Sequence, residues 1–154
     1  MARFTEQRAV NRLCSYWNLL REDRNYPRKD EIELEEIKDI LEYCFIIKVN
    51  ETDDEKKKYN FVHLGSEVAE IYNMDTDIMH ISPMTENLYQ HLDSILTDKE
   101  PVIEDLDLQG SVGHHLIGRQ CLLPLSDDNQ EVNYILGAVS CRKEKYDYFY
   151  DVNT

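Results

Sequence analysis

The chain has 154 residues, of which 42% are hydrophobic, and it carries a formal net charge of −14. This length and apolar content predict one folded domain and exclude a disordered chain. The charge is uneven: residues 1–30 carry seven basic against four acidic side chains, whereas residues 31–154 carry ten against 27. Because an acidic body repels phosphate groups, we expect binding neither to nucleic acid nor to anionic lipid.

No apolar run approaches the roughly 20 residues of a membrane-spanning helix, and the N-terminus lacks the apolar core of a secretion signal. We therefore expect a cytoplasmic protein with no membrane insertion. The cysteines lack the paired C-x-x-C spacing of structural zinc sites, and we interpret them as buried thiols, with a redox-sensing thiol as the alternative. They are Cys14, Cys44, Cys121 and Cys141.

Apolar residues recur every three or four positions over residues 4–22, which predicts an amphipathic helix that ends before Pro27. Its apolar stripe can be buried in two ways: against a second copy of the chain, as a homodimer contact, or on the chain's own domain as part of the core. We adopt the dimer contact as the hypothesis. The stripe consists of Val10, Leu13, Trp17 and Leu20.

The rest of the chain alternates short helical and strand patterns. Helices are predicted over 31–41, 66–73 and 84–97 from apolar residues at helical spacing. Strands are predicted from aromatic and β-branched runs over 43–49, 59–64, 101–108, 120–125 and 134–142, and the first two are expected to form an antiparallel hairpin.

This order predicts an α+β fold, with a five-stranded antiparallel sheet, short helices on one face and an additional N-terminal amphipathic helix. We divide the chain into the helix and connector at 1–30, a domain at 31–145 and a C-terminal tail at 146–154.

Several short sequence blocks, taken in their order and spacing, resemble a family of single-domain PAS proteins common in alphaproteobacteria. They are Tyr-Trp-Asn-Leu-Leu-Arg at 16–21, Pro-Arg-Lys-Asp at 27–30, Phe-Val-His-Leu-Gly-Ser at 61–66, Leu-Leu-Pro-Leu-Ser-Asp-Asp at 122–128 and Tyr-Ile-Leu-Gly-Ala at 134–138. The resemblance spans about residues 12–142. It departs after Gly65-Ser66, where Tyr-Asn-Met-Asp-Thr-Asp at 72–77 replaces a second glycine-rich signature.

The resemblance implies a PAS-like fold and a stand-alone sensory or regulatory domain. Such a domain acts through protein contacts, by homodimerising and by docking to a signalling partner such as a histidine kinase. A small apolar ligand in the core is compatible with this function, and a filled core is the alternative that we favour, since interior positions are usually packed. The candidate pocket residues are Phe45, Ile47, Phe61, Val62, Ile71, Leu88, Leu92, Leu123 and Ile135.

We expect no cofactor and no enzymatic activity. The flavin-binding cysteine motif of light-sensing PAS domains is absent, and a lone histidine at position 91 is weak support for haem. Phosphate-binding loops, nucleophile elbows and metal-ligand spacings are also absent from the sequence. The alternative function is a small α+β enzyme that uses His91 or His115 as its acid or base, although His114-His115 is predicted to lie in an exposed glycine-rich turn.

Overall fold

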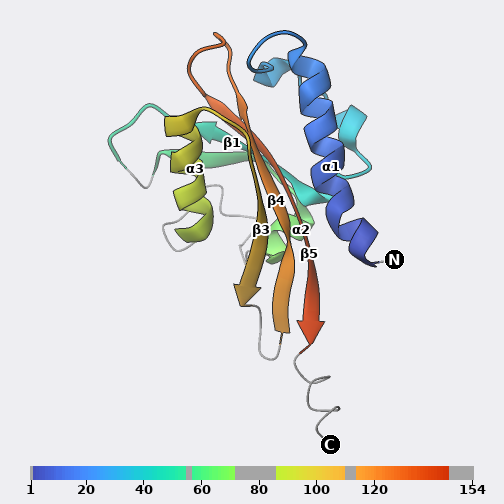
Figure 1. The fold of residues 1–154 in the computed structure, drawn as a ribbon. Helices are drawn as coiled ribbons and strands as arrows, with labels where there is room; N and C mark the ends of the chain where they lie inside the picture. The colour runs from blue at the N-terminus through green and yellow to red at the C-terminus, as the bar shows by residue number, and fades with distance from the viewer. Residues whose placement is uncertain (1, 55–56, 72–85, 110–113, 146–154) are drawn as a thin grey trace, which may run out of the picture.

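The centre of the fold is one five-stranded antiparallel sheet with the strand order β2-β1-β5-β4-β3 (Figure 1). A computed structural model describes residues 2–54, 57–71, 86–109 and 114–145; the predicted tail 146–154 and the segment 72–77 lie outside these residues. The strands are β1 (Cys44–Val49), β2 (Tyr59–Leu64), β3 (Val102–Gln109), β4 (His114–Leu125) and β5 (Tyr134–Lys145). The predicted α+β fold with a five-stranded antiparallel sheet is confirmed.

The helices cover both faces of this sheet (Figure 1). Helix α1 (Ala2–Arg21) lies across one face, which we call the outer face. Helices α2 (Ser66–Ile71) and α3 (Glu86–Asp98) lie on the opposite, inner face. The short α-helices therefore share one face, as predicted, and the additional N-terminal helix packs on the other.

Burial on both faces explains why the strands read as continuous apolar runs. In β1, Cys44 and Ile46 belong to the core cluster under α1, whereas Phe45 and Ile47 belong to the cluster under α3. Successive side chains of a strand point to opposite faces, so a run buried on both sides shows no polar alternation. The sheet thus separates two apolar clusters.

The helix predicted over 31–41 is wrong. The segment contains three separate 3-10 turns, at Lys29–Glu31, Leu34–Ile37 and Leu41–Tyr43. Only Ile37 and Ile40 of its apolar residues are buried. Most apolar side chains of the segment therefore never form the continuous buried stripe that would stabilise an α-helix.

Strands β4 and β5 pair over more residues than the hydrophobic pattern predicts. Their ladder runs from the pair Leu125 and Tyr134 out to the pair His114 and Lys145. The turn predicted at His114-His115 is therefore wrong, because strand β4 begins at His114. Gly118 and Arg119 interrupt the apolar run of β4, and residues 142–145 of β5 are all charged, so the hydrophobic pattern predicts shorter strands. None of the helices within the described ranges is long and apolar enough to cross a membrane.

Candidate functional site: a groove beside the N-terminal helix

The apolar stripe of α1 is buried in the chain's own core. Val10, Leu13 and Trp17 are at most 4% exposed, and Leu20 packs at the edge of the same cluster. The cluster also contains Leu123 and other side chains of the outer face. The predicted homodimer contact through this stripe is therefore corrected: the stripe is covered by the sheet, which is the alternative placement.

Trp17 anchors α1 to the C-terminal end of strand β4. Its indole Nε1 donates a hydrogen bond of 2.9 Å to the carbonyl oxygen of Pro124, so the polar atom of this buried ring is satisfied. The guanidinium carbon of Arg21 lies 5.6 Å from the centre of the indole ring, within the range of a cation–π contact. Helix α1 is thus held by a buried aromatic ring with a directional hydrogen bond.

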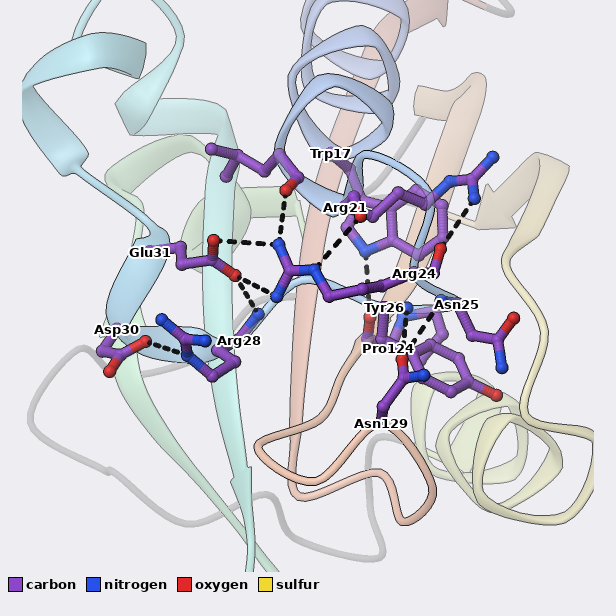
Figure 2. A network of polar contacts seen from close by, with 11 residues as sticks. Trp17, Arg21, Arg24, Asn25, Tyr26, Arg28, Asp30, Glu31, Pro124 and Asn129 are labelled. Carbon is purple, nitrogen blue, oxygen red and sulfur yellow. Dashed lines mark hydrogen bonds and ion pairs between the residues drawn. The ribbon is translucent and has the colours of Figure 1, made fainter.

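The side chain of Arg24 caps the C-terminal end of α1 (Figure 2). It donates to the carbonyl oxygens of Leu20 at 2.7 Å and Arg21 at 3.2 Å, which are among the carbonyls that a helix end leaves without an intrahelical partner. The same guanidinium binds both carboxylate oxygens of Glu31, at 2.8 and 2.9 Å. The hydrogen bond from Arg24 holds the pKa of Glu31 below its usual value.

The connector after α1 is fixed to the turn between β4 and β5. Asn129 adopts a left-handed backbone conformation, with φ of 63°. Its side-chain Oδ1 accepts hydrogen bonds from the backbone N–H groups of Asn25 at 3.1 Å and Tyr26 at 3.2 Å (Figure 2). Asparagine tolerates this backbone conformation better than most residues. The hydroxyl of Tyr26 donates to the carbonyl oxygen of Lys99 at 2.7 Å. Three loops distant in sequence are therefore tied together.

A groove of about 560 Å³ opens between α1, this connector and the start of β3. Its apolar part includes Trp17, Leu123 and Ile103, whose side chain is 54% exposed. Aromatic and aliphatic groups inside a polar rim that includes arginine form the usual composition of a protein contact site. The remaining lining residues are Cys14, Asn18, Arg21, Asn25, Tyr26, Asp98, Lys99, Glu100 and Pro101.

The predicted ligand pocket corresponds in part to the inner cluster. Phe45, Ile47, Phe61, Leu92 and Ile135 are buried in this one cluster, and Ile71 packs at its edge. The rings of Phe45 and Phe61 meet edge to face, with centroids 6.0 Å apart. A Cβ added to Gly137 would overlap the ring of Phe45, so this ring lies directly on the backbone of β5. These described side chains pack against one another.

Two predicted pocket residues lie elsewhere. Leu123 points to the outer face and lines the groove, and Val62 is 42% exposed. Their neighbours Leu122 and Phe61 occupy the inner cluster, and adjacent strand residues cannot point to the same face. Leu88 lies in α3, but its side chain is outside the described residues.

His91 links α3 to the sheet. Its Nε2 lies 2.8 Å from Oε1 of Glu104 on β3, and Nε2 of the fully buried Gln120 on β4 donates to the same oxygen at 3.2 Å. This arrangement gives the histidine a structural partner. The side chain of His115, the other residue of the enzyme alternative, is outside the described residues. Within the described ranges, no three His, Cys, Asp or Glu side chains gather as metal ligands would.

The groove was not predicted from sequence as a site. It combines α1, the loop between α3 and β3, and β4, which are separated by many residues. The polar residues Asn25 and Asn129, which fix its wall, give only a turn signal in the sequence. The one usable sign is Trp17, which belongs to the predicted apolar stripe and also lines the groove.

Several solved structures are similar to this chain. A PAS domain of BvgS from Bordetella pertussis is 14% identical, with a TM-score of 0.48 over 81% of this chain and 96% of that chain. A variant of the fungal photoreceptor VVD is 10% identical, with a TM-score of 0.42 over 64% and 76% of the two chains. A sensory box sensor histidine kinase from Vibrio cholerae is 11% identical, with a TM-score of 0.37 over 74% and 92%.

Likeness at these identities and scores carries no argument about ligand or partner. No curated protein matches the sequence. The sequence model of a PAS domain family matches residues 5–140, which includes most of α1 and every strand in whole or in part. The predicted resemblance is confirmed, and the chain belongs to the PAS domain family.

Proposed function

We propose that the chain is a sensory or regulatory PAS domain whose output is contact with a signalling protein, such as a histidine kinase, at the groove beside α1. The observation that supports this most directly is the exposed Ile103 beside the apolar part of a groove with a fixed polar wall. Docking that buries such a side chain gains hydrophobic free energy without unfolding any part of the chain.

The polar network supports a contact role because it fixes the groove before a partner arrives. The hydrogen bonds of Asn129 and Tyr26 join the connector to the β4–β5 turn and to the loop before β3. A wall that is already ordered loses little conformational entropy on binding. The rim contains Arg21 and Lys99 as well as Asp98 and Glu100, so the matching partner surface presents an apolar side chain flanked by charges of both signs.

We also propose a homodimer. Its contact is formed by exposed apolar residues and not by the buried stripe of α1. Leu19 on α1 is 75% exposed, and Ile103 is exposed at the groove. A second copy that covered either residue would leave the core contacts of Trp17 intact. Measurement of the oligomeric mass separates this arrangement from docking of a different protein.

The ligand and enzyme predictions remain predictions. A small apolar ligand in the inner cluster is supported by the convergence of Phe45, Phe61 and Leu92, but it would have to displace side chains that already pack together. The prediction that the chain is not an enzyme is supported by the family match.

The substitution Ile103→Asp tests the groove. We expect it to reduce capture of the signalling partner at least about tenfold, because central apolar contacts contribute more than about 1.4 kcal/mol to an interface. Val62→Asp is the matched control, since Val62 is similarly exposed on a strand at the opposite edge of the sheet. Both variants should keep wild-type folding stability within about 0.5 kcal/mol.

Affinity purification of the full chain with quantitative mass spectrometry measures this loss, and light scattering measures the oligomeric mass. Partners retained by V62D and lost by I103D are the expected result. If a second copy covers Ile103, I103D alone of the three proteins should have monomeric mass. Equal capture of the same partners by both variants and the wild type would show that the groove is not the contact surface.

A further inference from the structure

Strand β3 forms one edge of the sheet, and among the described residues it pairs with β4 alone (Figure 1). The ladder continues without a register shift along all eight residues of β3, from the pair Val102 and Leu122 to the pair Gln109 and His115. Alternate residues of such a strand direct both their N–H and their C=O away from the neighbouring strand. Within the described ranges, no backbone hydrogen bond joins these outward groups to a turn or loop. The edge of β3 is therefore open to a further strand.

The opposite edge of the sheet is less suited to a further strand. Strand β2 has six residues, and its ladder with β1 changes register between Ile46 and Ile47. A register irregularity increases the local twist and turns an edge away from an incoming strand. Of the two edges, that of β3 is thus the longer and the more regular.

The β3 edge is acidic. Its eight residues include Glu104, Asp105 and Asp107, and no lysine or arginine. The side chain of Asp105 is 83% exposed, and its Oδ1 lies 3.3 Å from Nε of Arg119 on β4. Like charges opposite one another on paired strands are destabilising, so edge-to-edge pairing with the acidic β3 of a second copy is disfavoured. The same charges favour a strand that carries lysine or arginine.

An apolar side chain lies beside this acidic one on the same face. Ile103 pairs with Cys121 of the outer cluster, and Asp105 follows two residues later, so both side chains project from the outer face. Ile103 is 54% exposed there and lines the groove, whereas Leu106 is turned into the inner cluster. An added strand therefore meets an apolar position at the groove and an acidic position next to it.

We propose that the edge of β3 binds an extended, basic segment of a signalling protein, which adds to the sheet as a further antiparallel strand. Backbone hydrogen bonds to the outward groups of β3 hold such a segment, and its side chains give specificity. The matching segment places an apolar residue opposite Ile103 and a lysine or arginine opposite Asp105. This deepens the proposed function, on which it rests, because it states which chemistry the partner presents beside the groove.

The test titrates the purified, isotope-labelled full chain with the acetylated and amidated peptide Thr-Lys-Thr-Lys-Thr-Val-Thr and follows the backbone amides of the chain by NMR. Antiparallel pairing places the valine of the peptide opposite Ile103 and its second lysine opposite Asp105. We expect the amide signals of residues 102–109 to shift, and the hydrogen exchange of the outward amides to slow, because these N–H groups gain acceptors. A peptide with glutamate in place of both lysines should bind at least about fivefold more weakly.

Backbone methylation of the peptide distinguishes strand addition from a charge contact. One methylated peptide carries N-methyl groups on its threonines, and the other carries them on its lysines and valine. Only alternate residues of an added strand bond to β3, so one of the two peptides should bind at least about tenfold more weakly than the parent, and the other about as well. A purely electrostatic contact would be indifferent to which amides are methylated.

The substitution Asp105→Lys should weaken binding of the peptide at least about fivefold, because it replaces an attraction by a repulsion. Asp53→Lys is the matched control, since it makes the same charge change at an exposed position of the loop before β2, and it should bind the peptide as the wild type does. The ion pair of Asp105 is exposed, so D105K should fold like the wild type by circular dichroism.

Absence of shifts at β3, equal binding of the two methylated peptides, or equal peptide binding by D105K and D53K would overturn the inference. None of these outcomes changes the expected loss of partner capture by I103D, which depends on an apolar side chain of the groove. Conversely, peptide shifts at β3 together with full partner capture by I103D would refute the proposed contact at the groove and leave the strand site standing.

Discussion

Replacing Trp17 by alanine is expected to lower the free energy of unfolding by about 3–5 kcal/mol, the usual cost of removing a large buried aromatic side chain. Trp17 is 4% exposed and lies between α1 and strand β4. A change of this size is a large fraction of the total stability of a domain. Chemical denaturation followed by far-ultraviolet circular dichroism measures it, because the variant has no tryptophan left.

Two further variants separate the causes. Trp17→Phe keeps most of the ring but removes the donor to the carbonyl of Pro124, and we expect a smaller loss of about 1–3 kcal/mol. Leu19→Ala changes a side chain on the same helix that is 75% exposed, and it should stay within about 0.5 kcal/mol of the wild type. If W17A were as stable as L19A, α1 would not be part of the core.

The substitution Gly65→Ala has the second largest expected effect, a destabilisation of about 3 kcal/mol, at the upper end of the range for overpacking. Gly65 joins β2 to α2, and its N–H donates to the carbonyl oxygen of Cys44 at 2.8 Å. A Cβ at this position would lie 2.7 Å from that same oxygen and nearer still to the carbonyl of Glu42. These are backbone atoms, so no side-chain rotation relieves the clash.

Thermal and urea unfolding of G65A measure this cost. Glu70→Ala is the control, because it places an alanine at an exposed position of the neighbouring helix, where no backbone atom is crowded by it. The control should be close to the wild type in stability. An alanine at position 65 with wild-type stability would contradict the tight approach of the β2–α2 junction to the segment before β1.

The fold was largely predictable because its main signals are local. The runs at β1 and β2 are dense in aromatic and β-branched residues, and the apolar spacing of α1 is regular until the connector to Pro27. The segment 31–41 was mispredicted because its apolar residues suit a helix while only Ile37 and Ile40 are buried. The outer ends of β4 and β5 were missed because glycine and charged residues interrupt the apolar pattern there, although the backbone pairing continues.

The candidate pocket was partly predictable, because strand residues that are apolar can be recognised from local sequence. The inclusion of both Phe61 and Val62 conflicts with strand periodicity, and only Phe61 is buried. Leu122 and Leu123 are both buried, on opposite faces, and no pattern in a doubly buried strand tells which face is which. The sequence also left open what covers the stripe of α1, since core and dimer contacts bury the same residues.

The groove could not be predicted, because it depends on contacts between distant segments. Cys14 on α1 and Leu123 on β4 are separated by most of the chain and line the same groove only when α1 packs on β4. The same packing brings the loop before β3 to the connector, where Tyr26 meets Lys99. Tertiary structure creates these features, whereas local sequence only supplies the residues.

The central claim is that α1 is docked on the sheet as part of one core, and the fluorescence of the single tryptophan tests it most directly. We predict that Trp17 of the native chain emits at shorter wavelength than in the unfolded chain. Its emission should also change with urea in the same transition as the circular dichroism signal of the sheet. Native emission like that of the unfolded chain, or a transition of Trp17 before that of the sheet, would contradict the account.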